Sequence, residues 1–341
     1  MGARSMNNAK TIAIGATMKL RTFSAISCVT VLLGAALTAS AQNYPAKPVR
    51  VIVPFPPAGA ADIVARHISN GLSEALGVQF VVENRGGAAG AIGAELATRA
   101  VPDGYTLMMT SSSTMSINPH LSSRQAYDPI NGFTPIVLTG FSANVVAVHP
   151  SVPARTVKEL IALAKAKPGV MTFSSNGNGT ISHLTGELFM QQAGINMVHI
   201  PYKGASGAVI DVIAGQVTLL FAAYPSIAAQ MRAGKLRALA VTSSKRVQLA
   251  PELPTIAEAA LPGFESNQWW GAYGPPGVPA AIVTRLNTEL NKVMHGAELR
   301  RKFAVDGIEP GSGTPADLAA YLKTDFDRWG KVVRAAGIKP E

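Results

Sequence analysis

Short runs rich in β-branched and aromatic residues alternate with helical segments along most of this 341-residue chain. This alternation is typical of an α/β protein, in which helices connect the strands and cover the sheet. It predicts strands at 49–53, 79–82, 105–109, 144–148, 171–174, 197–201, 217–222, 236–242 and 268–273. It predicts helices at 61–76, 156–167, 181–193, 206–214, 225–233, 279–295 and 315–336, and one more that ends at Arg99.

Two alternating series follow one another, and the chain is long enough for two hydrophobic cores. We therefore predict two α/β lobes joined by a two-segment hinge, with crossings near 144–150 and 266–274. The first lobe is expected to be discontinuous, comprising 42–146 and 268–341, and the second lobe to be 147–267. Ligands of such folds bind at the carboxyl ends of the strands.

The first 41 residues have the pattern of a secretory signal. Lys19 and Arg21 precede a mostly apolar stretch at 26–37, and Ala39-Ser40-Ala41 offers the small residues that signal peptidase accepts. The apolar stretch is too short for an ordinary membrane-spanning helix. We expect translation from Met18, cleavage after Ala41 and a soluble mature protein in the periplasm.

Removal of the signal changes the composition of the mature chain. Cys28 is the only cysteine, so the mature chain has no thiol or disulfide chemistry. The net charge falls from +10 to +6, because the signal holds Arg4, Lys10, Lys19 and Arg21 and no acidic residue. The lack of a basic cluster interleaved with aromatic residues argues against nucleic-acid binding. A mild positive field favours small anions.

Two loops that connect a strand to a helix are candidates for binding an anion. The loop 54–61 combines prolines, which stiffen it, with Gly59, which permits close approach of a ligand to the backbone. The loop 174–183 is rich in small residues with hydroxyl or amide groups. Both precede a helix, whose first N–H groups and dipole favour an anion. An ordinary turn, with Asp62 balancing the helix dipole, is the alternative interpretation of the first loop.

Further residues could line such a site. Ser113 belongs to a hydroxyl-rich run after the third predicted strand and is a binding candidate. Tyr202 could stack on a ligand or hydrogen-bond to it, whereas Lys203 is expected to be solvated. The segment 221–225, where a strand meets a turn, contains no acidic residue.

The sequence motifs of enzymes are incomplete or missing. Gly86-Gly87-x-x-Gly90 does not have the spacing of a dinucleotide-binding loop, and helix packing explains these glycines better. No G-x-S-x-G nucleophile elbow occurs. The six histidines form no i, i+4 pair and have no cysteine partner that would suggest a metal site. We expect no catalytic residue, no cofactor and no metal.

Taken together, these segments resemble the Bug-type receptors of the tripartite tricarboxylate transporter family across essentially the whole mature chain. The resemblance implies a type II periplasmic-binding-protein fold whose two lobes hold a ligand carboxylate through backbone N–H groups, small hydroxyls and ordered water. The matching segments are Tyr44-Pro45-x-Lys47-Pro48, Pro54-Phe55-Pro56-Pro57, Val82-Glu83-Asn84-Arg85, Pro102-Asp103-Gly104-Tyr105-Thr106-Leu107, Glu159-Leu160, Ala164-Lys165-Ala166, Gly177-Asn178-Gly179-Thr180, Ser182-His183-Leu184, Val198-His199-x-Pro201-Tyr202-Lys203-Gly204, Gly234-Lys235-Leu236-Arg237-Ala238-Leu239-Ala240 and Leu253-Pro254-Thr255.

The resemblance also implies which residues contact the ligand. In the first lobe the contacts fall on the segment 55–61, namely Phe55, Pro57, Ala58, Gly59, Ala60 and Ala61. In the second lobe they fall on Ser175, Asn178, Gly179 and Thr180, with Tyr202 and Ala223 lining the remainder. This chain departs from the family pattern at Ala58, where a glycine is usual, and at Ala61, where a threonine is frequent.

A third departure bears on the ligand. Many members carry an acid just after the strand that here ends at Phe221, whereas this chain has Ala222 and Ala223. Because a buried ammonium needs a partner, we predict an amine-free di- or tricarboxylate, or an aromatic carboxylate resting on Phe55, Tyr202 or Tyr224.

The resemblance implies an inner-membrane permease of the tripartite tricarboxylate type as partner, and we expect a monomer. Two alternatives remain open. One is a receptor that feeds a sensor kinase, and the other is a secreted hydrolase of carboxylic esters.

Overall fold

The computed structural model describes residues 44–123, 126–247 and 250–335. The chain divides into Met1–Ala46, of which the last three residues are described, and a compact unit, Lys47–Glu341. Every helix and strand of the described residues belongs to the second unit. The predicted signal, its cleavage site and Cys28 lie outside the described residues.

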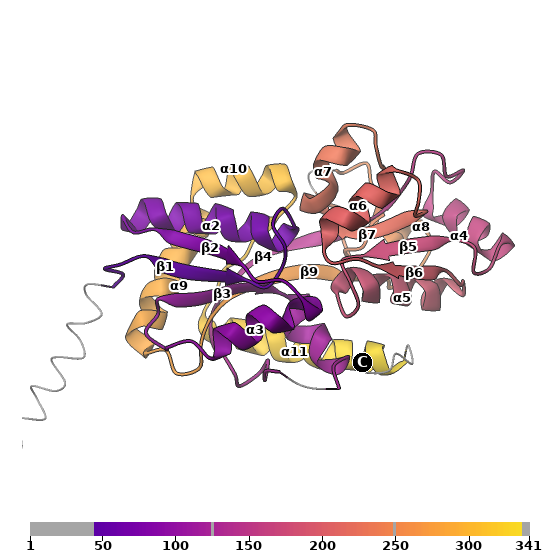
Figure 1. Ribbon diagram of the computed structural model, residues 1–341. Helices are drawn as coiled ribbons and strands as arrows, with labels where there is room; N and C mark the ends of the chain where they lie inside the picture. The colour runs from indigo at the N-terminus through magenta and orange to yellow at the C-terminus, as the bar shows by residue number, and fades with distance from the viewer. Residues whose placement is uncertain (1–43, 124–125, 248–249, 336–341) are drawn as a thin grey trace, which may run out of the picture. The chain divides into compact units, whose positions relative to one another are not determined.

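The first lobe is built on a mixed sheet with the strand order β2-β1-β3-β9-β4. β1 is parallel to β2 and β3, whereas β9 runs antiparallel to β3 and β4. Helices α2 and α10 lie on one face and α3 and α11 on the other (Figure 1), while α9 packs against α2 and β4. The strands are β1 (Val49–Val53), β2 (Phe80–Asn84), β3 (Thr106–Ser111), β4 (Thr134–Val148), β9 (Asn267–Gly274) and the short β10 (Glu309–Pro310). The helices are α2 (Ala60–Leu76), α3 (Ala91–Thr98), α9 (Ala280–His295), α10 (Ala297–Asp306) and α11 (Pro315–Ala335).

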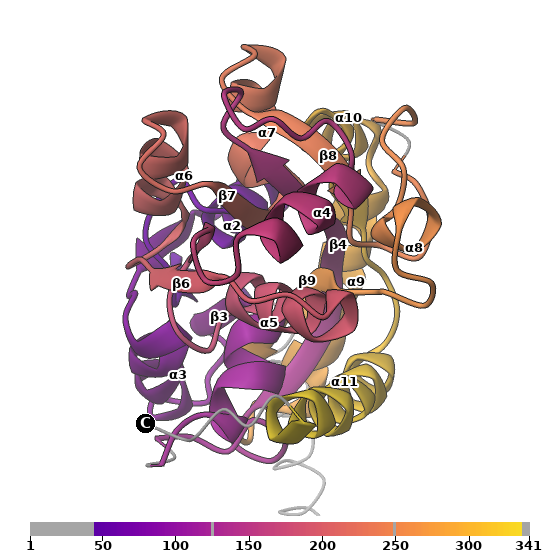
Figure 2. The ribbon, with the colours of Figure 1, turned by 90° about the vertical axis from the view of Figure 1, so that its right-hand side faces the viewer.

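In the second lobe the sheet continues from β4 in the order β4-β7-β5-β6, with β8 also paired to β4, and helices cover both faces (Figure 2). Alternate residues of β4 enter two different cores: Val146 and Val148 pack with α4, α5 and α8, whereas Val145 and Ala147 pack with α6 and α7. This period of two is that of a strand buried on both faces. The remaining strands are β5 (Thr172–Ser175), β6 (Val198–Pro201), β7 (Leu219–Ala223) and β8 (Arg237–Val241). The helices are α4 (Val157–Ala166), α5 (Ile181–Ala193), α6 (Ala205–Ile213), α7 (Tyr224–Arg232) and α8 (Ile256–Ala259).

β4 is shared by the two lobes. Its residues up to Ala143 pair with β9, and those from Asn144 onward pair with β7 and β8. β9 begins at Asn267, on the second predicted crossing. The two α/β lobes with two connecting segments confirm the predicted fold class, while the lobe limits at 146/147 and 267/268 stay a prediction.

The elements differ from the predicted ones mainly in the first lobe. β4 is fifteen residues long and starts at Thr134, whereas the apolar pattern predicted only its last five residues. Two register shifts interrupt its pairing with β9, and Gly140 lies close to the backbone of β10, so the regular alternation is lost there. α10 was also missed, because Leu299 and Phe303 are the only two residues of this ten-residue helix that are buried.

The glycines that resemble a dinucleotide loop are used for packing. A Cβ on Gly93 would lie 2.6 Å from the Cβ of Pro54, and one on Gly90 would lie 2.1 Å from Thr114 Oγ1. Close packing therefore accounts for Gly90 and for Gly93 of α3, whereas Gly86 and Gly87 precede the helix.

Gly186 in α5 should be intolerant of any side chain. An added Cβ would lie 2.3 Å from the ring of Phe173, which is fully buried. We expect Gly186→Ala to lower the free energy of unfolding by about 1–3 kcal/mol through overpacking, measured by urea denaturation. Adding Phe173→Leu should relieve part of the clash, so the two effects should be less than additive. Additive effects would contradict this packing.

Candidate functional site

A pocket with an empty volume of about 490 Å³, its open mouth included, lies among residues of both lobes. Most of its lining residues stand at the carboxyl ends of strands, where ligands of α/β folds bind. The lining consists of Phe55, Pro56, Pro57, Gly59, Ala60 and Ala61 after β1, Ser111 and Ser113 at the end of β3, Asn176 after β5, Gly204 and Ala205 after β6, Ala223 at the end of β7, and Asn144, Gln268 and Trp270 on β4 and β9.

The loop between β1 and α2 is organised by the buried carboxylate of Asp62. This carboxylate accepts hydrogen bonds from the Ala58 N–H at 3.0 Å, from Arg66 Nε at 2.9 Å and from Asn84 Nδ2 at 2.9 Å. Asn84 Nδ2 also donates to the Phe55 carbonyl at 3.0 Å. Asp62 therefore does more than balance a helix dipole, because it fixes the shape of the wall that the loop gives to the pocket.

The ionised form of Asp62 is the one that holds this loop. Burial by itself would raise the pKa of Asp62, but the hydrogen bonds from Arg66, Ala58 and Asn84 together bring the pKa below its ordinary value. The carboxylate stays charged at neutral pH and keeps the hydrogen bonds that it accepts from Ala58, Arg66 and Asn84.

Helix α6 begins at the pocket, opposite this loop. Its N-cap, Gly204, has a φ of 123°, which favours glycine. A Cβ at this position would lie 2.9 Å from Pro56 Cγ, so the absence of a side chain lets the two lobes approach here.

Helices α2 and α6 both present uncapped N-termini to the pocket. Their N-cap residues, Gly59 and Gly204, make no side-chain capping hydrogen bond. The first N–H groups of a helix have no partner within the helix, and the helix dipole places partial positive charge there. Among the described lining residues, none has an ionisable side chain. The pocket therefore attracts an anion through backbone groups.

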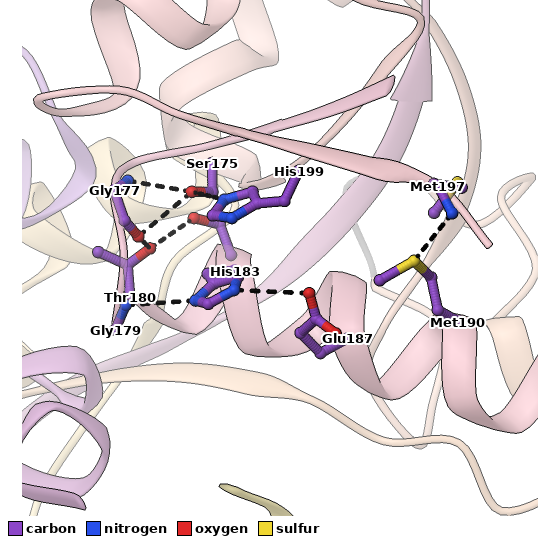
Figure 3. Close-up of polar contacts among 10 residues, drawn as sticks. Ser175, Gly177, Gly179, Thr180, His183, Glu187, Met190, Met197 and His199 are labelled. Carbon is purple, nitrogen blue, oxygen red and sulfur yellow. Dashed lines mark hydrogen bonds and ion pairs between the residues drawn. The ribbon is translucent and has the colours of Figure 1, made fainter. Parts of the chain in front are cut away.

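The loop 174–183 uses much of its own polar capacity internally (Figure 3). The Gly179 N–H donates to His183 Nδ1 at 3.3 Å, and the Thr180 hydroxyl donates to the Gly177 carbonyl at 2.7 Å. A Cβ on Gly179 would lie 3.2 Å from Asn118 Oδ1 of the first lobe. These groups shape the loop and its contact with the first lobe, beside the pocket.

Two imidazole rings stack beneath this loop. His183 and His199 have ring centroids 4.0 Å apart with an interplanar angle of 7°, and Phe173 stacks on the other side of His199 at 4.8 Å. Burial and the neighbouring His183 lower the pKa of His199 to about 3. His199 is therefore neutral under physiological conditions.

Ser175 Oγ lies 2.6 Å from His199 Nε2, a nucleophile–base geometry that the sequence motifs did not reveal. The Ser175 hydroxyl is not available for attack, however. Ser175 is only 1% exposed, its Oγ also accepts the Gly177 N–H at 3.1 Å, and neither Ser175 nor His199 lines the pocket. The pair orders the loop instead.

The structure brings about half of the predicted binding residues to the pocket. Phe55, Pro57, Gly59, Ala60, Ala61, Ser113 and Ala223 line it. Ala58, Ser175, Asn178, Gly179, Thr180 and Tyr202 are not in its lining, and their direct contact with a ligand stays a prediction. The Tyr202 hydroxyl donates to Asp211, and the neighbouring residues Gly204 and Ala205 line the pocket instead.

Several lining residues were missed by sequence reasoning. Asn144 and Gln268 are polar residues at the crossings between the lobes, each at the start of a predicted strand whose other residues are mostly apolar or aromatic. This departure from the strand pattern was the available signal. Asn176 and Gly204 lie in candidate binding segments, but the predicted ligand contacts fall on other residues of those segments.

Within residues 44–123, 126–247 and 250–335, no group of three or more His, Cys, Asp or Glu side chains could hold a metal ion. Over the same residues, no helix combines the length and apolarity needed to cross a membrane.

The lowered pKa of His199 should make stability depend on pH. Below pH 6.5, the ordinary pKa of histidine, His199 binds a proton in the unfolded chain but not in the folded chain. The contribution of His199 to the free energy of unfolding is therefore fully present above pH 6.5 and decreases as the pH falls toward 3. Because His199 is only partly buried, we expect a loss smaller than the limit of about 1.4 kcal/mol per pH unit. Urea denaturation between pH 7 and 5 measures it.

His199→Gln should flatten this pH profile, whereas His295→Gln, at an exposed position of α9, should keep the wild-type slope. An identical slope in wild type and His199→Gln would show that His199 is not kept neutral by the fold.

Comparison with known proteins gives one family. The family described as "Tripartite tricarboxylate transporter family receptor" matches residues 64–338. The protein BugT of Bordetella pertussis is 35% identical over 307 residues, which cover 90% of this chain and 94% of BugT.

Two solved structures share the fold. Rpa4515 of R. palustris, solved with adipate, superposes with a TM-score of 0.86 at 34% identity, covering 87% of this chain and 100% of that one. The periplasmic binding protein BugD superposes with a TM-score of 0.83 at 32% identity, covering 87% of this chain and 100% of BugD.

Proposed function

We propose that this chain, which belongs to the tripartite tricarboxylate transporter receptor family, captures a small amine-free carboxylate between its lobes. Its membership makes it a solute-binding receptor with a periplasmic-binding-protein fold. The observation that carries the proposal is the meeting of two uncapped helix N-termini, at Gly59 and Gly204, in one pocket.

The composition of the pocket supports a ligand without an amine. A buried ammonium would need a charged or strongly polar partner, and the described lining contains no acidic side chain. The end of β7 contributes Ala223, at the place where many family members carry an acid. The carboxylate of adipate, in the structure of Rpa4515, is the kind of group that we infer here.

The shape of the ligand is constrained by two aromatic residues. Phe55 and Trp270 are the aromatic side chains of the described lining, so an aromatic carboxylate would rest on them rather than on Tyr202 or Tyr224. A di- or tricarboxylate would use the same walls for its methylene groups. We propose both classes.

Backbone donors suffice for useful affinity without an arginine. Micromolar binding corresponds to about 8 kcal/mol. A hydrogen bond to a charged group contributes roughly 1.5–3 kcal/mol, so four to six of them reach this range after the ordering of the lobes is subtracted.

We further propose that the mature protein is monomeric, soluble in the periplasm after cleavage of its signal at Ala41, and without enzymatic activity. Closure of the lobes around the ligand would be the state that a tripartite tricarboxylate-type permease recognises. A receptor that feeds a sensor kinase is the alternative. Uptake of the ligand that requires both this protein and the permease would favour transport.

A thermal-shift screen of carboxylates tests the function as a whole. We expect at least one di-, tri- or aromatic carboxylate to raise the melting temperature and to be recovered unchanged. Conversion of the ligand without stoichiometric retention would instead favour the hydrolase.

A pair of substitutions at Ala205 tests the electrostatics of the α6 N-terminus. Ala205 is 8% exposed and lines the pocket. Asn and Asp have nearly the same size, so Ala205→Asp and Ala205→Asn differ mainly in charge. We expect Ala205→Asp to bind the carboxylate found by the screen at least tenfold more weakly than Ala205→Asn, about 1.4 kcal/mol, by calorimetry. Equal affinities would show that the anion does not sit at α6.

A further inference from the structure

Asn144 stands at the point where β4 passes from one lobe to the other. Its backbone is fully paired, since its N–H donates to Thr242 Oγ1 at 3.0 Å and its carbonyl accepts the Thr242 N–H at 2.9 Å. The residue is 0% exposed and lines the pocket. Neither Nδ2 nor Oδ1 of its side chain has a hydrogen-bond partner among the described residues.

An unpaired amide of this kind is unfavourable in a folded protein. Buried polar groups are nearly always hydrogen-bonded, and an unsatisfied one destabilises the fold. Of the described residues with unpaired buried polar atoms, Asn144 alone lines the pocket. The position of this amide therefore points to a partner that enters the pocket.

The chemistry of the amide restricts that partner. Nδ2 can only donate and Oδ1 can only accept. A carboxylate accepts but cannot donate, so it would satisfy Nδ2 and leave Oδ1 unpaired beside an anionic oxygen. An ammonium donates but cannot accept, so it would leave Nδ2 unpaired. A hydroxyl group both donates and accepts.

We propose that Asn144 determines specificity by recognising a hydroxyl group, and that the ligand is a hydroxycarboxylate. This inference rests on the proposed function, in which the N-termini of α2 and α6 hold the carboxylate. The hydroxyl then faces the strands that connect the lobes, where Gln268 and Asn144 line the pocket. Gln268 Nε2 already donates to the Trp269 carbonyl at 3.2 Å. Of the amide side chains in the described lining, Asn144 is the one whose Nδ2 and Oδ1 are both fully buried and unpaired.

The test compares ligands that differ in one substituent. Malate, succinate and aspartate share two carboxylates and carry a hydroxyl, a hydrogen or an ammonium at one carbon. Citrate with tricarballylate, and 4-hydroxybenzoate with benzoate, extend the comparison to larger and aromatic ligands. By calorimetry we expect at least one hydroxylated member to bind at least tenfold more tightly than its unhydroxylated partner, and malate to exceed aspartate if that series binds.

Asn144→Leu should abolish the preference and, without ligand, raise the melting temperature, because an unpaired amide is replaced by an apolar side chain of similar size. Thr139→Val is the matched control. Thr139 lies on the same strand, is fully buried and has an unpaired Oγ1, but does not line the pocket. Thr139→Val should also raise the melting temperature while keeping the hydroxyl preference. If Asn144→Leu does not fold, Asn144→Ala replaces it in the binding comparison.

The outcomes separate this inference from the function beneath it. Carboxylates that bind equally well with and without the hydroxyl would overturn the role of Asn144 and leave the carboxylate receptor standing. A preference that survives in Asn144→Leu or Asn144→Ala would overturn it as well. If none of the seven probes binds, and no other carboxylate in the screen does, the proposed function itself fails.

Discussion

Backbone N–H groups that no side chain caps are the feature on which this site depends. Helices normally satisfy their first N–H groups with a Ser, Thr, Asp or Asn at the N-cap, but α2 and α6 both begin after a glycine without such a bond. Their N-termini face one pocket in which no described lining residue has an ionisable side chain. In the proposed function an anion bonds to both N-termini, so that binding and closure of the lobes are coupled.

Other residues of the second lobe make the contacts that hold the two lobes close to each other. The missing side chain at Gly204 allows Pro56 to approach, and the Ile181 N–H donates across the lobes to Ser113 Oγ at 2.9 Å. The stacked rings of His183 and His199 hold the loop that leads into α5, whose first residue is Ile181. These contacts bring the lobes together beside the pocket, and the first residues of α2 and α6 line the pocket that the proposed ligand would enter.

Much of the fold was predictable because its strands are strongly apolar and its loops are punctuated by proline and glycine. β1 and α5 were placed at their observed limits for this reason. The site was harder to predict, because the identity of a residue does not show whether its backbone N–H group will face a ligand. The hydroxyls of the loop 174–183 predict an anion cradle. Those of Thr180 and Ser182 bond to each other, that of Thr180 also bonds to the Gly177 carbonyl, and their contact with a ligand stays a prediction. Asn144 could not be identified from the sequence, because its proposed role rests on two side-chain atoms that have no hydrogen-bond partner among the described residues.

The most direct measurement of the central claim is a titration followed by backbone amide resonances, using the carboxylate that stabilises the protein most. We expect the amides of Ala60, Ala61 and Ala205 to show the large downfield shifts of N–H groups that bind an anion. Shifts of that size at Ser175, Asn178 and Gly179, with Ala60, Ala61 and Ala205 unchanged, would contradict it.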